Sequence, residues 1–406
     1  MKINNLIEIE EKLPTNYIKR NLHQDLVLSL NNEEATILYG ARQVGKSVEI
    51  WELIKMIFEK KMGDIYYFNF DIPPKEANSP DEFINMILGS RTNDKVFVFI
   101  DEAQGLSNIG KWIKYLYDQK KGIKWILSGS ASLDLKNKVK ESLIGRKYEY
   151  YLSSLSLTEI SQYKGFEISK LVGNFDGLQK MVEEYLRFGG YPGVINLDTI
   201  EEKKKKLDEI AQTYLISDIS RMYGIEDKEN LRGVASYLAE NVGNVYSKEK
   251  LSGITGISRY EVNKCVEAME GGFIVRKIRT FSKDSSREVT HRPKFYFEDV
   301  GIRNALVGKL DEGRLIMDKG ALFENLVVKL AAEKWGWKYV KYWRTNNQTE
   351  VDVVIQKPDG RLSVFEAKYS PTIGTPKNVK GFMEKYGKII DEVKIVSMDN
   401  WWDVVK

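Results

Sequence analysis

Residues 40–47 of this sequence read GARQVGKS, which places two glycines, a lysine and a serine in the spacing G-x-x-x-x-G-K-S. Glycines let successive backbone N–H groups curve around phosphate oxygens, and a helix that begins there adds positive potential. The ammonium of Lys46 can reach the β- and γ-phosphates of a nucleotide, and the hydroxyl of Ser47 can bind Mg²⁺. An apolar strand precedes the loop and a helical pattern follows it, which disfavours a chance glycine-rich turn. We therefore predict ATP and Mg²⁺ as cofactors, with nucleotide contacts from Gly40, Ala41, Arg42, Gln43, Val44, Gly45, Lys46, Ser47 and Val48.

Two acidic residues follow another apolar stretch about 55 residues farther along, in VFVFIDEAQ (96–104). In a protein with a phosphate-binding loop, the first acid, Asp101, holds Mg²⁺ through its water shell. The second acid, Glu102, is placed to act as the general base that activates the attacking water. Such a pair is common at strand ends by itself, but together with the loop it predicts that the nucleotide is hydrolysed.

A third apolar stretch, KWILSGS (124–130), ends in hydroxyl groups. Ser128 or Ser130 could donate a hydrogen bond to the γ-phosphate or to the attacking water, and an ordinary serine-rich turn explains the pattern equally well. Arg146 follows this region, and we consider it as an arginine finger toward a neighbouring subunit, which implies a homo-oligomer. Arg42 is an alternative finger, and a simple surface arginine is the alternative for Arg146.

Carboxylates recur near the end of the chain. Glu324 lies in a helical stretch that is apolar nearly all round, where a charge is costly unless it is paired or binds a metal. Asp352 and the pair Glu366 and Lys368 lie in two strands joined by the turn KPDG, and the period of two lets them converge at one end of a hairpin. Carboxylates placed in this way can hold Mg²⁺, which lowers the pKa of a bound water, while a lysine stabilises the transition state. We predict a metal site from these four residues; the alternatives are a salt-bridged hairpin edge and a domain that binds without cutting.

The segment 227–299 has the pattern of three helices followed by two strands. Ser258 and Glu261 have the spacing of a capping box, so the third helix is predicted to start at Ser258. Between residues 241 and 294 there are 11 Lys/Arg and 6 Asp/Glu, a local net charge of +5. A helix-turn-helix with a basic wing can place its third helix in the major groove, although such modules also serve as protein-interaction surfaces. We predict DNA contacts from Arg259, Asn263 and Lys264, and a core stripe of Val262, Val266 and Met269 with Cys265 beside it.

The elements that must position these groups change in type along the chain. Up to about residue 150, short apolar stretches alternate with helical patterns, which favours a parallel sheet with right-handed crossovers. Helical patterns follow to about residue 225, interrupted by FGGYPG (188–193). From residue 320 the pattern is a helix, two alternating strands, a helix and a last strand. We therefore predict an α/β multidomain protein.

The overall composition excludes several classes of protein. Hydrophobic residues make up 42% of the 406 residues, which is enough for buried cores and excludes a mainly disordered chain. The single cysteine, Cys265, excludes a disulfide or thiolate-zinc framework, and His23 and His291 lie too far apart in sequence for a histidine-rich metal site. The net charge of +4 does not by itself identify a nucleic-acid binder. We expect neither a signal peptide nor a membrane partner, and therefore a soluble cytoplasmic protein.

The segments GARQVGKS, VFVFIDEAQ, LSGSAS and FGGYPGV together resemble an AAA-type ATPase family that is common in archaea and bacteria. Members of this family carry a C-terminal winged helix and a PD-(D/E)XK nuclease-like domain, and most of their cellular roles are uncharacterised. The usual proline before the first acid of the nuclease motif is absent here. The resemblance covers nearly the whole chain and implies four domains: a parallel-sheet P-loop ATPase core (1–154), a helical lid (155–226), a winged helix-turn-helix (227–299) and a restriction-endonuclease-like α/β domain (300–406).

These features lead us to expect an ATP-hydrolysing enzyme whose nucleotide state repositions a DNA-binding winged helix and a nuclease-like domain. An alternative is a regulatory nucleotide switch that binds a protein partner and neither binds nor cuts DNA. A third possibility is a defence or mobile-element nuclease in which ATP hydrolysis gates cutting. Stimulation of ATP hydrolysis by DNA separates the first possibility from the second.

Overall fold

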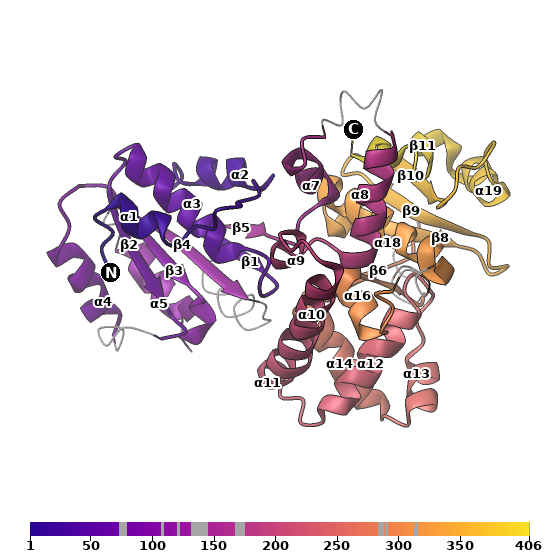
Figure 1. Cartoon of the computed structure of the whole chain (residues 1–406), viewed down its shortest axis with the longest axis horizontal. Helices are drawn as coiled ribbons and strands as arrows, with labels where there is room; N and C mark the ends of the chain where they lie inside the picture. Colours follow the sequence, from indigo (N-terminus) through magenta and orange to yellow (C-terminus); the bar gives the residue numbers. More distant parts are fainter. Residues whose placement is uncertain are drawn as a thin grey trace. The chain divides into compact units, whose positions relative to one another are not determined.

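The computed structural model describes residues 1–72, 79–106, 109–119, 122–130, 145–166, 175–282, 288, 291–311, 313 and 316–405. These residues form two compact units, Met1–Leu155 and Ser156–Lys406, and each is described by itself (Figure 1). Most of the polar connection predicted between the two strands of the segment 227–299 lies outside the described residues. Among the helices described, none has the length and apolar character needed to cross a membrane.

A parallel sheet of five strands forms the centre of the first unit. Its strands follow the spatial order β2-β3-β4-β1-β5, and every neighbouring pair is parallel. This confirms the predicted parallel sheet and adds one strand, β5, to the four expected. The strands are β1 (Ala35–Gly40), β2 (Asp64–Asn69), β3 (Val96–Asp101), β4 (Ile123–Ser130) and β5 (Lys147–Tyr151).

Helices lie on both faces of this sheet, and its central strands are accordingly apolar on both sides. Alternate strand residues such as Phe68, Val98 and Leu127 form one buried cluster with side chains of α4 and α5. The opposite face packs against α3, which follows β1 directly (Figure 1). The helices are α1 (Leu6–Glu10), α2 (His23–Ser29), α3 (Lys46–Glu59), α4 (Pro80–Gly89) and α5 (Ile109–Asp118), with a 3-10 turn η2 (Ala103–Gly105).

The second unit begins with helices whose packing explains the glycine-rich turn at 188–193. Gly189 has a φ of 70°, and a Cβ there would lie 2.0 Å from Oδ1 of Asp299, so a larger residue would displace that carboxylate. The same carboxylate accepts a hydrogen bond from the Gly190 N–H at 2.8 Å and another from the Gly301 N–H at 2.9 Å. The turn therefore ties α8 to the start of α16. The helices here are α7 (Leu157–Tyr163), α8 (Phe175–Phe188), α9 (Pro192–Ile195), α10 (Ile200–Ile210), the π-helical η4 (Ala211–Asp218), α11 (Ile219–Tyr223) and α16 (Val300–Leu306).

Three helices and a two-stranded antiparallel sheet lie between α11 and α16 in the predicted order. The predicted capping box is present, because the Ser258 hydroxyl accepts the Glu261 N–H at 3.2 Å and the Glu261 carboxylate accepts the Ser258 N–H at 3.3 Å. The predicted core stripe is also confirmed, since Val262, Cys265, Val266 and Met269 are all buried. The elements are α12 (Lys228–Glu240), α13 (Lys248–Thr255), α14 (Arg259–Gly271), β6 (Val275–Ile278) and β7 (Lys294–Phe297).

A mixed four-stranded sheet ends the second unit. Its order is β11-β10-β9-β8, in which β10 and β11 are parallel and the other neighbours are antiparallel. The register pairs Phe365 with Val353, so Glu366 stands opposite Asp352 on the same face of the sheet, as predicted. The strands are β8 (Val340–Arg344), β9 (Glu350–Gln356), β10 (Leu362–Ala367) and β11 (Ile390–Val396). The helices are α18 (Lys319–Trp335) and α19 (Lys377–Tyr386), with 3-10 turns η5 (Ile316–Asp318), η6 (Trp337–Tyr339), η7 (Gly387–Ile389) and η8 (Trp401–Val404).

Candidate functional site

The phosphate-binding loop lies where β1 ends and α3 begins. Gly45 precedes α3 with a φ of 100°, a left-handed conformation that glycine adopts without strain. The buried ammonium of Lys46 donates to the carbonyl oxygens of Gly40 and Ala41, at 3.1 and 2.8 Å. Burial lowers the pKa of Lys46, and the carboxylates at the end of β3 oppose this effect. A phosphate group that entered the loop would replace the two carbonyls as partners of this ammonium.

The two acids at the end of β3 form a hydrogen-bonded network with the two serines at the end of β4. β4 lies between β1 and β3, so the serines lie between the phosphate-binding loop and the acids. Ser128 donates to Oδ1 of Asp101, and Ser130 donates to Oε2 of Glu102 at 3.0 Å. The structure thus brings together four residues that the sequence analysis selected from two separate segments.

Glu102 combines an unusual backbone conformation with a charged carboxylate. Its φ of 50° and ψ of 46° are left-handed, which costs a residue with a side chain about 1–3 kcal/mol. Burial by itself raises the pKa of the carboxyl, but the charge of Lys46 and the hydrogen bonds from Gln104 and Ser130 outweigh it, so the pKa is lowered. Glu102 is therefore ionised at neutral pH and can accept a proton from water. The backbone strain fits a position held for function.

Two residues that the sequence analysis did not select hold the acids in place. The side-chain amide of Gln104 donates both to Glu102 and, at 3.0 Å, to Ser130. The hydroxyl of Tyr67, on β2, donates to Oδ2 of Asp101 at 2.9 Å. The position of Gln104 two residues after Glu102 was the one sequence feature that could have indicated its role. No sequence feature indicated the role of Tyr67, because it lies on another strand.

Replacing Gln104 with Ala is expected to lower kcat for ATP hydrolysis about tenfold, which is the effect of one hydrogen bond to a charged group. The amide orients Glu102 without belonging to the phosphate-binding loop, so the KM for ATP should stay near that of the unchanged protein. Steady-state phosphate release measures both constants. Gln24→Ala, at an exposed position on α2, is the matched control. An unchanged kcat in Gln104→Ala would remove this residue from the site.

Three arginines lie at different places in the first unit. Arg20, which the sequence analysis did not select, is buried and donates to the carbonyl of Val44 in the loop at 2.8 Å. Arg42 lies near enough to Glu102 to contribute to its lowered pKa, after burial, Lys46 and the hydrogen bonds. Arg146 lies beside the start of β1, about 17 Å along that strand from the loop, and its side chain pairs with Asp118 at 3.0 Å. Arg146 therefore cannot reach the phosphate-binding loop of its own chain.

Mg²⁺ is the metal that the loop implies, and the donors fit it. The hydroxyl of Ser47, in the first turn of α3, and the carboxylate of Asp101, at the adjoining strand ends, are hard oxygen ligands of the kind Mg²⁺ prefers. Bound with ATP, the ion would offset the charge of the phosphate oxygens.

Three carboxylates meet in the second unit, on α18 and β9. One oxygen from each of Glu324, Glu350 and Asp352 lies within 4.8 Å of the others. Glu350 was not among the predicted ligands, although its position two residues before Asp352 placed it on the same strand face. The two remaining predicted members pair with each other, since Lys368 donates to Oε1 of Glu366 at 2.7 Å.

A lysine from β7 enters this cluster. Nζ of Lys294 lies 3.1 Å from Oε1 of Glu324 and also contacts Glu350, and the side chain is 1% exposed. Burial alone would lower the pKa of Lys294, but the surrounding carboxylates raise it. The pKa of Asp352 is raised by burial and by the charges of Glu324 and Glu366, as expected for clustered acids. Glu324, Glu350 and Asp352 lie close enough together to hold a metal ion, and the ammonium of Lys294 contacts two of them, so the predicted metal site stays a prediction.

The predicted DNA-contact residues on α14 differ in their surroundings. Arg259 is exposed at the start of the helix. Asn263 donates to Oε1 of Glu267 at 2.7 Å, and the ammonium of Lys264 donates to the carbonyl of Gly224 at 2.5 Å. The last two side chains are thus engaged within the chain, which leaves Arg259 as the best placed of the three to meet a phosphate.

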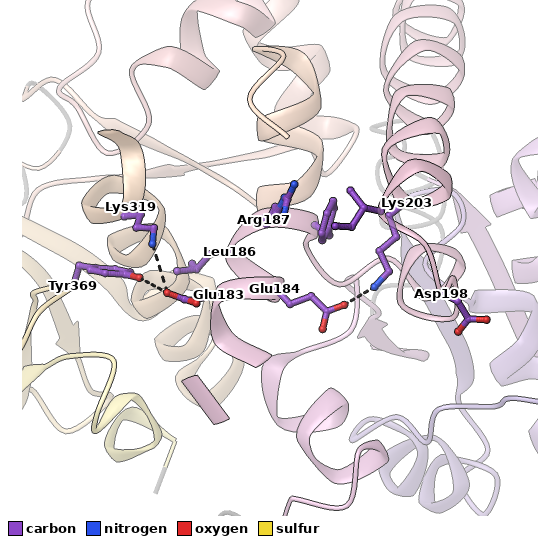
Figure 2. A pocket seen from close by; sticks show the side chains of 10 residues that line it. Glu183, Glu184, Leu186, Arg187, Asp198, Lys203, Lys319 and Tyr369 are labelled. Carbon is purple, nitrogen blue, oxygen red and sulfur yellow. Dashed lines mark hydrogen bonds and ion pairs between the residues drawn. The ribbon is translucent and has the colours of Figure 1, made fainter. Parts of the chain in front are cut away.

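A cavity of about 290 Å³ lies in the second unit, lined by residues of α8, α10 and α18 (Figure 2). Four of its charged groups have partners in the chain: Glu183 accepts from the hydroxyl of Tyr369 at 3.0 Å and from Lys319 at 3.5 Å, and Glu184 pairs with Lys203. Glu183, Glu184, Lys203 and Lys319 are therefore paired within the chain.

Three family models match consecutive parts of the chain. Residues 32–161 match an AAA domain, residues 179–312 match a domain of unknown function (DUF8612), and residues 319–401 match another (DUF4143). The AAA match spans the phosphate-binding loop, both acids and both serines.

The curated relatives have low sequence identity to this chain. An uncharacterized protein of Haemophilus influenzae is 23% identical to this chain, over 94% of this chain and 98% of its own length. An uncharacterized protein of Methanocaldococcus jannaschii is 24% identical, over 75% of this chain and 68% of its own length. Among solved structures, Cdc6p from Pyrobaculum aerophilum is 14% identical over 76% of this chain and 98% of its own, with a TM-score of 0.29. AMPPCP-bound DnaA from Aquifex aeolicus is 14% identical over 64% of this chain and 91% of its own, with a TM-score of 0.31. TM-scores this low carry no argument about this chain. The chain thus contains an AAA-family ATPase domain, followed by two domains of unknown function.

Proposed function

We propose that this protein binds ATP with Mg²⁺ and hydrolyses it, with Glu102 as the general base. One observation carries the proposal: Lys46 lies within electrostatic range of Asp101 and an ionised Glu102, and these two acids accept hydrogen bonds from Ser128 and Ser130. In this arrangement Lys46 binds the phosphates, Ser47 and Asp101 hold Mg²⁺, and Glu102 takes a proton from the attacking water. Phosphate release by the purified protein tests it: hydrolysis should require Mg²⁺ and cease when EDTA is added.

We further propose that DNA is the effector of this ATPase and binds at the start of α14. Arg259 is exposed there, and Arg292, which precedes β7, is exposed as well. Both guanidinium groups lie within electrostatic range of the same carboxylate, Glu249. Two exposed arginines in a segment of local charge +5 favour contact with DNA phosphates. The proposal includes no DNA cleavage, because Lys294 fills the cluster of carboxylates.

Replacing Arg259 or Arg292 with Ala is expected to weaken binding of duplex DNA and to reduce the log–log salt slope by ~0.9 for each phosphate that the protein no longer neutralises. Lys264→Ala should have a smaller effect, because its ammonium is held by Gly224. Arg361→Ala, at a 59% exposed side chain between β9 and β10, is the matched control. Binding titrations from low to physiological salt measure the slopes. Equal slopes in all four variants and the unchanged protein would exclude this surface.

A second candidate function is a nucleotide-dependent switch that binds a protein partner. The observation in its favour is that the same region exposes two large apolar side chains, Ile254 at 63% and Tyr260 at 77%. ATP hydrolysis measured with and without duplex, forked and single-stranded DNA separates the two candidates. Stimulation that disappears at high salt favours DNA, and a rate indifferent to all three nucleic acids favours the protein partner.

A further inference from the structure

The face of β7 that points toward the C-terminal sheet carries two groups that act on one carboxylate. Lys294 and Tyr296 are two residues apart and therefore lie on the same side of the strand. The tyrosine hydroxyl donates to Oε1 of Glu324 at 2.6 Å, and the ammonium lies 3.1 Å from the same oxygen. Both side chains are buried. The strand thus meets the carboxylate cluster with a cation and a donor.

Three carboxylates this close together need a positive charge between them. Their mutual repulsion is appreciable because all three residues are partly buried, which reduces screening by water. Lys294 supplies the charge: it contacts Glu324 and Glu350, acts on Asp352, and lies 5.3 Å from the ring centre of Tyr342. The ammonium is thereby enclosed by anions and an aromatic ring, as a resident ion would be.

The cluster also contains a spare oxygen ligand. Glu366 is 2% exposed and is directly opposite Asp352 in the sheet. Its Oε1 accepts from Lys368 and Asn378, whereas its Oε2 is buried and has no hydrogen-bond partner in the described part of the chain. A buried carboxylate oxygen with no partner is costly, so this oxygen is available to a cation that could reach it.

We infer that Lys294 is a built-in cation that takes the place of a divalent metal among Glu324, Glu350 and Asp352 and ties β7 to the C-terminal sheet. Other contacts support the same docking: the Phe281 N–H, beyond β6, donates to the carbonyl of Tyr342 at 2.5 Å, and Thr280 bridges to the same residue. While β7 lies here, the cluster is closed to metal. Removal of the ammonium creates a site for a divalent cation.

Binding of Mn²⁺ to nucleotide-free protein tests the inference, with all variants in a Ser47→Ala background to weaken the ATPase metal site. The Lys294→Met protein should bind one Mn²⁺ per chain at least ~10-fold more tightly than the protein that keeps Lys294, because the metal no longer has to displace a paired ammonium. Adding Asp352→Asn should abolish that gain. Lys329→Met removes another buried lysine, whose partner is the Tyr185 hydroxyl, and should gain no Mn²⁺ binding. The Mn²⁺ signal in electron paramagnetic resonance counts bound ions directly.

Thermal unfolding gives a second, independent measurement. Without metal, Lys294→Met should melt about 10 °C lower because the carboxylates lose their counter-charge, and Mn²⁺ should restore part of that loss. A neutralised variant, Lys294→Met with Glu324→Gln and Glu350→Gln, should fold without metal, and Mn²⁺ should not change its melting temperature. If Lys294→Met does not fold and the neutralised variant does, the inference is supported. The inference is overturned if the Lys294→Met protein folds without binding Mn²⁺, or if the protein that keeps Lys294 binds Mn²⁺ equally well. It is also overturned if the neutralised variant fails to fold.

Discussion

Replacing Glu102 with Gln is expected to slow ATP turnover by about 10²–10⁴-fold while ATP still binds. The amide keeps the shape of the side chain and can still accept the hydrogen bond from Ser130, but it cannot take a proton from water. The charge of Lys46 and the hydrogen bonds around Glu102 lower its pKa against the effect of burial, so the unchanged residue is ionised and ready to act. Single-turnover hydrolysis and equilibrium nucleotide binding, measured on the same preparation, separate the chemical step from binding.

Two further variants are needed to interpret this result. Lys46→Ala should lose both tight ATP binding and turnover, because the phosphates lose the ammonium that lies in the loop. Glu33→Gln changes an exposed glutamate of the same unit and should behave like the unchanged protein. If Glu102→Gln hydrolyses ATP at the full rate, Glu102 is not the base and Asp101 becomes the first alternative.

Arg146→Ala is expected to bind ATP normally and to hydrolyse it about 10³–10⁵-fold more slowly, the usual effect of an arginine finger. Arg146 lies at the opposite end of β1 from the phosphate-binding loop, so the arginine can act only on a neighbouring copy of the chain. Its ion pair with Asp118 would have to open on assembly. Turnover should accordingly rise with protein concentration, which dilution in the hydrolysis assay measures.

Mixing variants tests whether Arg146 acts on a neighbouring chain, without depending on a single rate. Arg146→Ala chains retain an intact loop, and Lys46→Ala chains retain an intact arginine, so mixed assemblies should recover part of the activity. Arg91→Ala, at an exposed arginine of the first unit, should hydrolyse normally and is the control. No recovery in mixtures that demonstrably co-assemble would assign Arg146 a structural role, and Arg42 would then be the arginine to test.

Groups that act within one continuous segment were predictable from the sequence. The spacing of 40–47 determines where the glycines, Lys46 and Ser47 fall, because a strand, a tight loop and a helix follow one another along the chain. The capping box of α14 and its buried stripe were predictable for the same reason, since both depend on residues three or four positions apart. Asp352 and Glu366 also face each other as the period of two requires.

Contacts between distant segments were decided by the tertiary structure alone. Gln104 and Tyr67 reach the acids from a turn and a neighbouring strand, and Arg20 reaches the loop from before β1. Lys294 lies 30 residues before Glu324 in the chain, yet its ammonium pairs with that carboxylate at the place where the sequence pattern predicted a metal. A pattern of carboxylates shows that a cation is needed. Only the packing of the strands decides which cation fills the place, because electrostatic compensation depends on distance in space and not on distance along the chain.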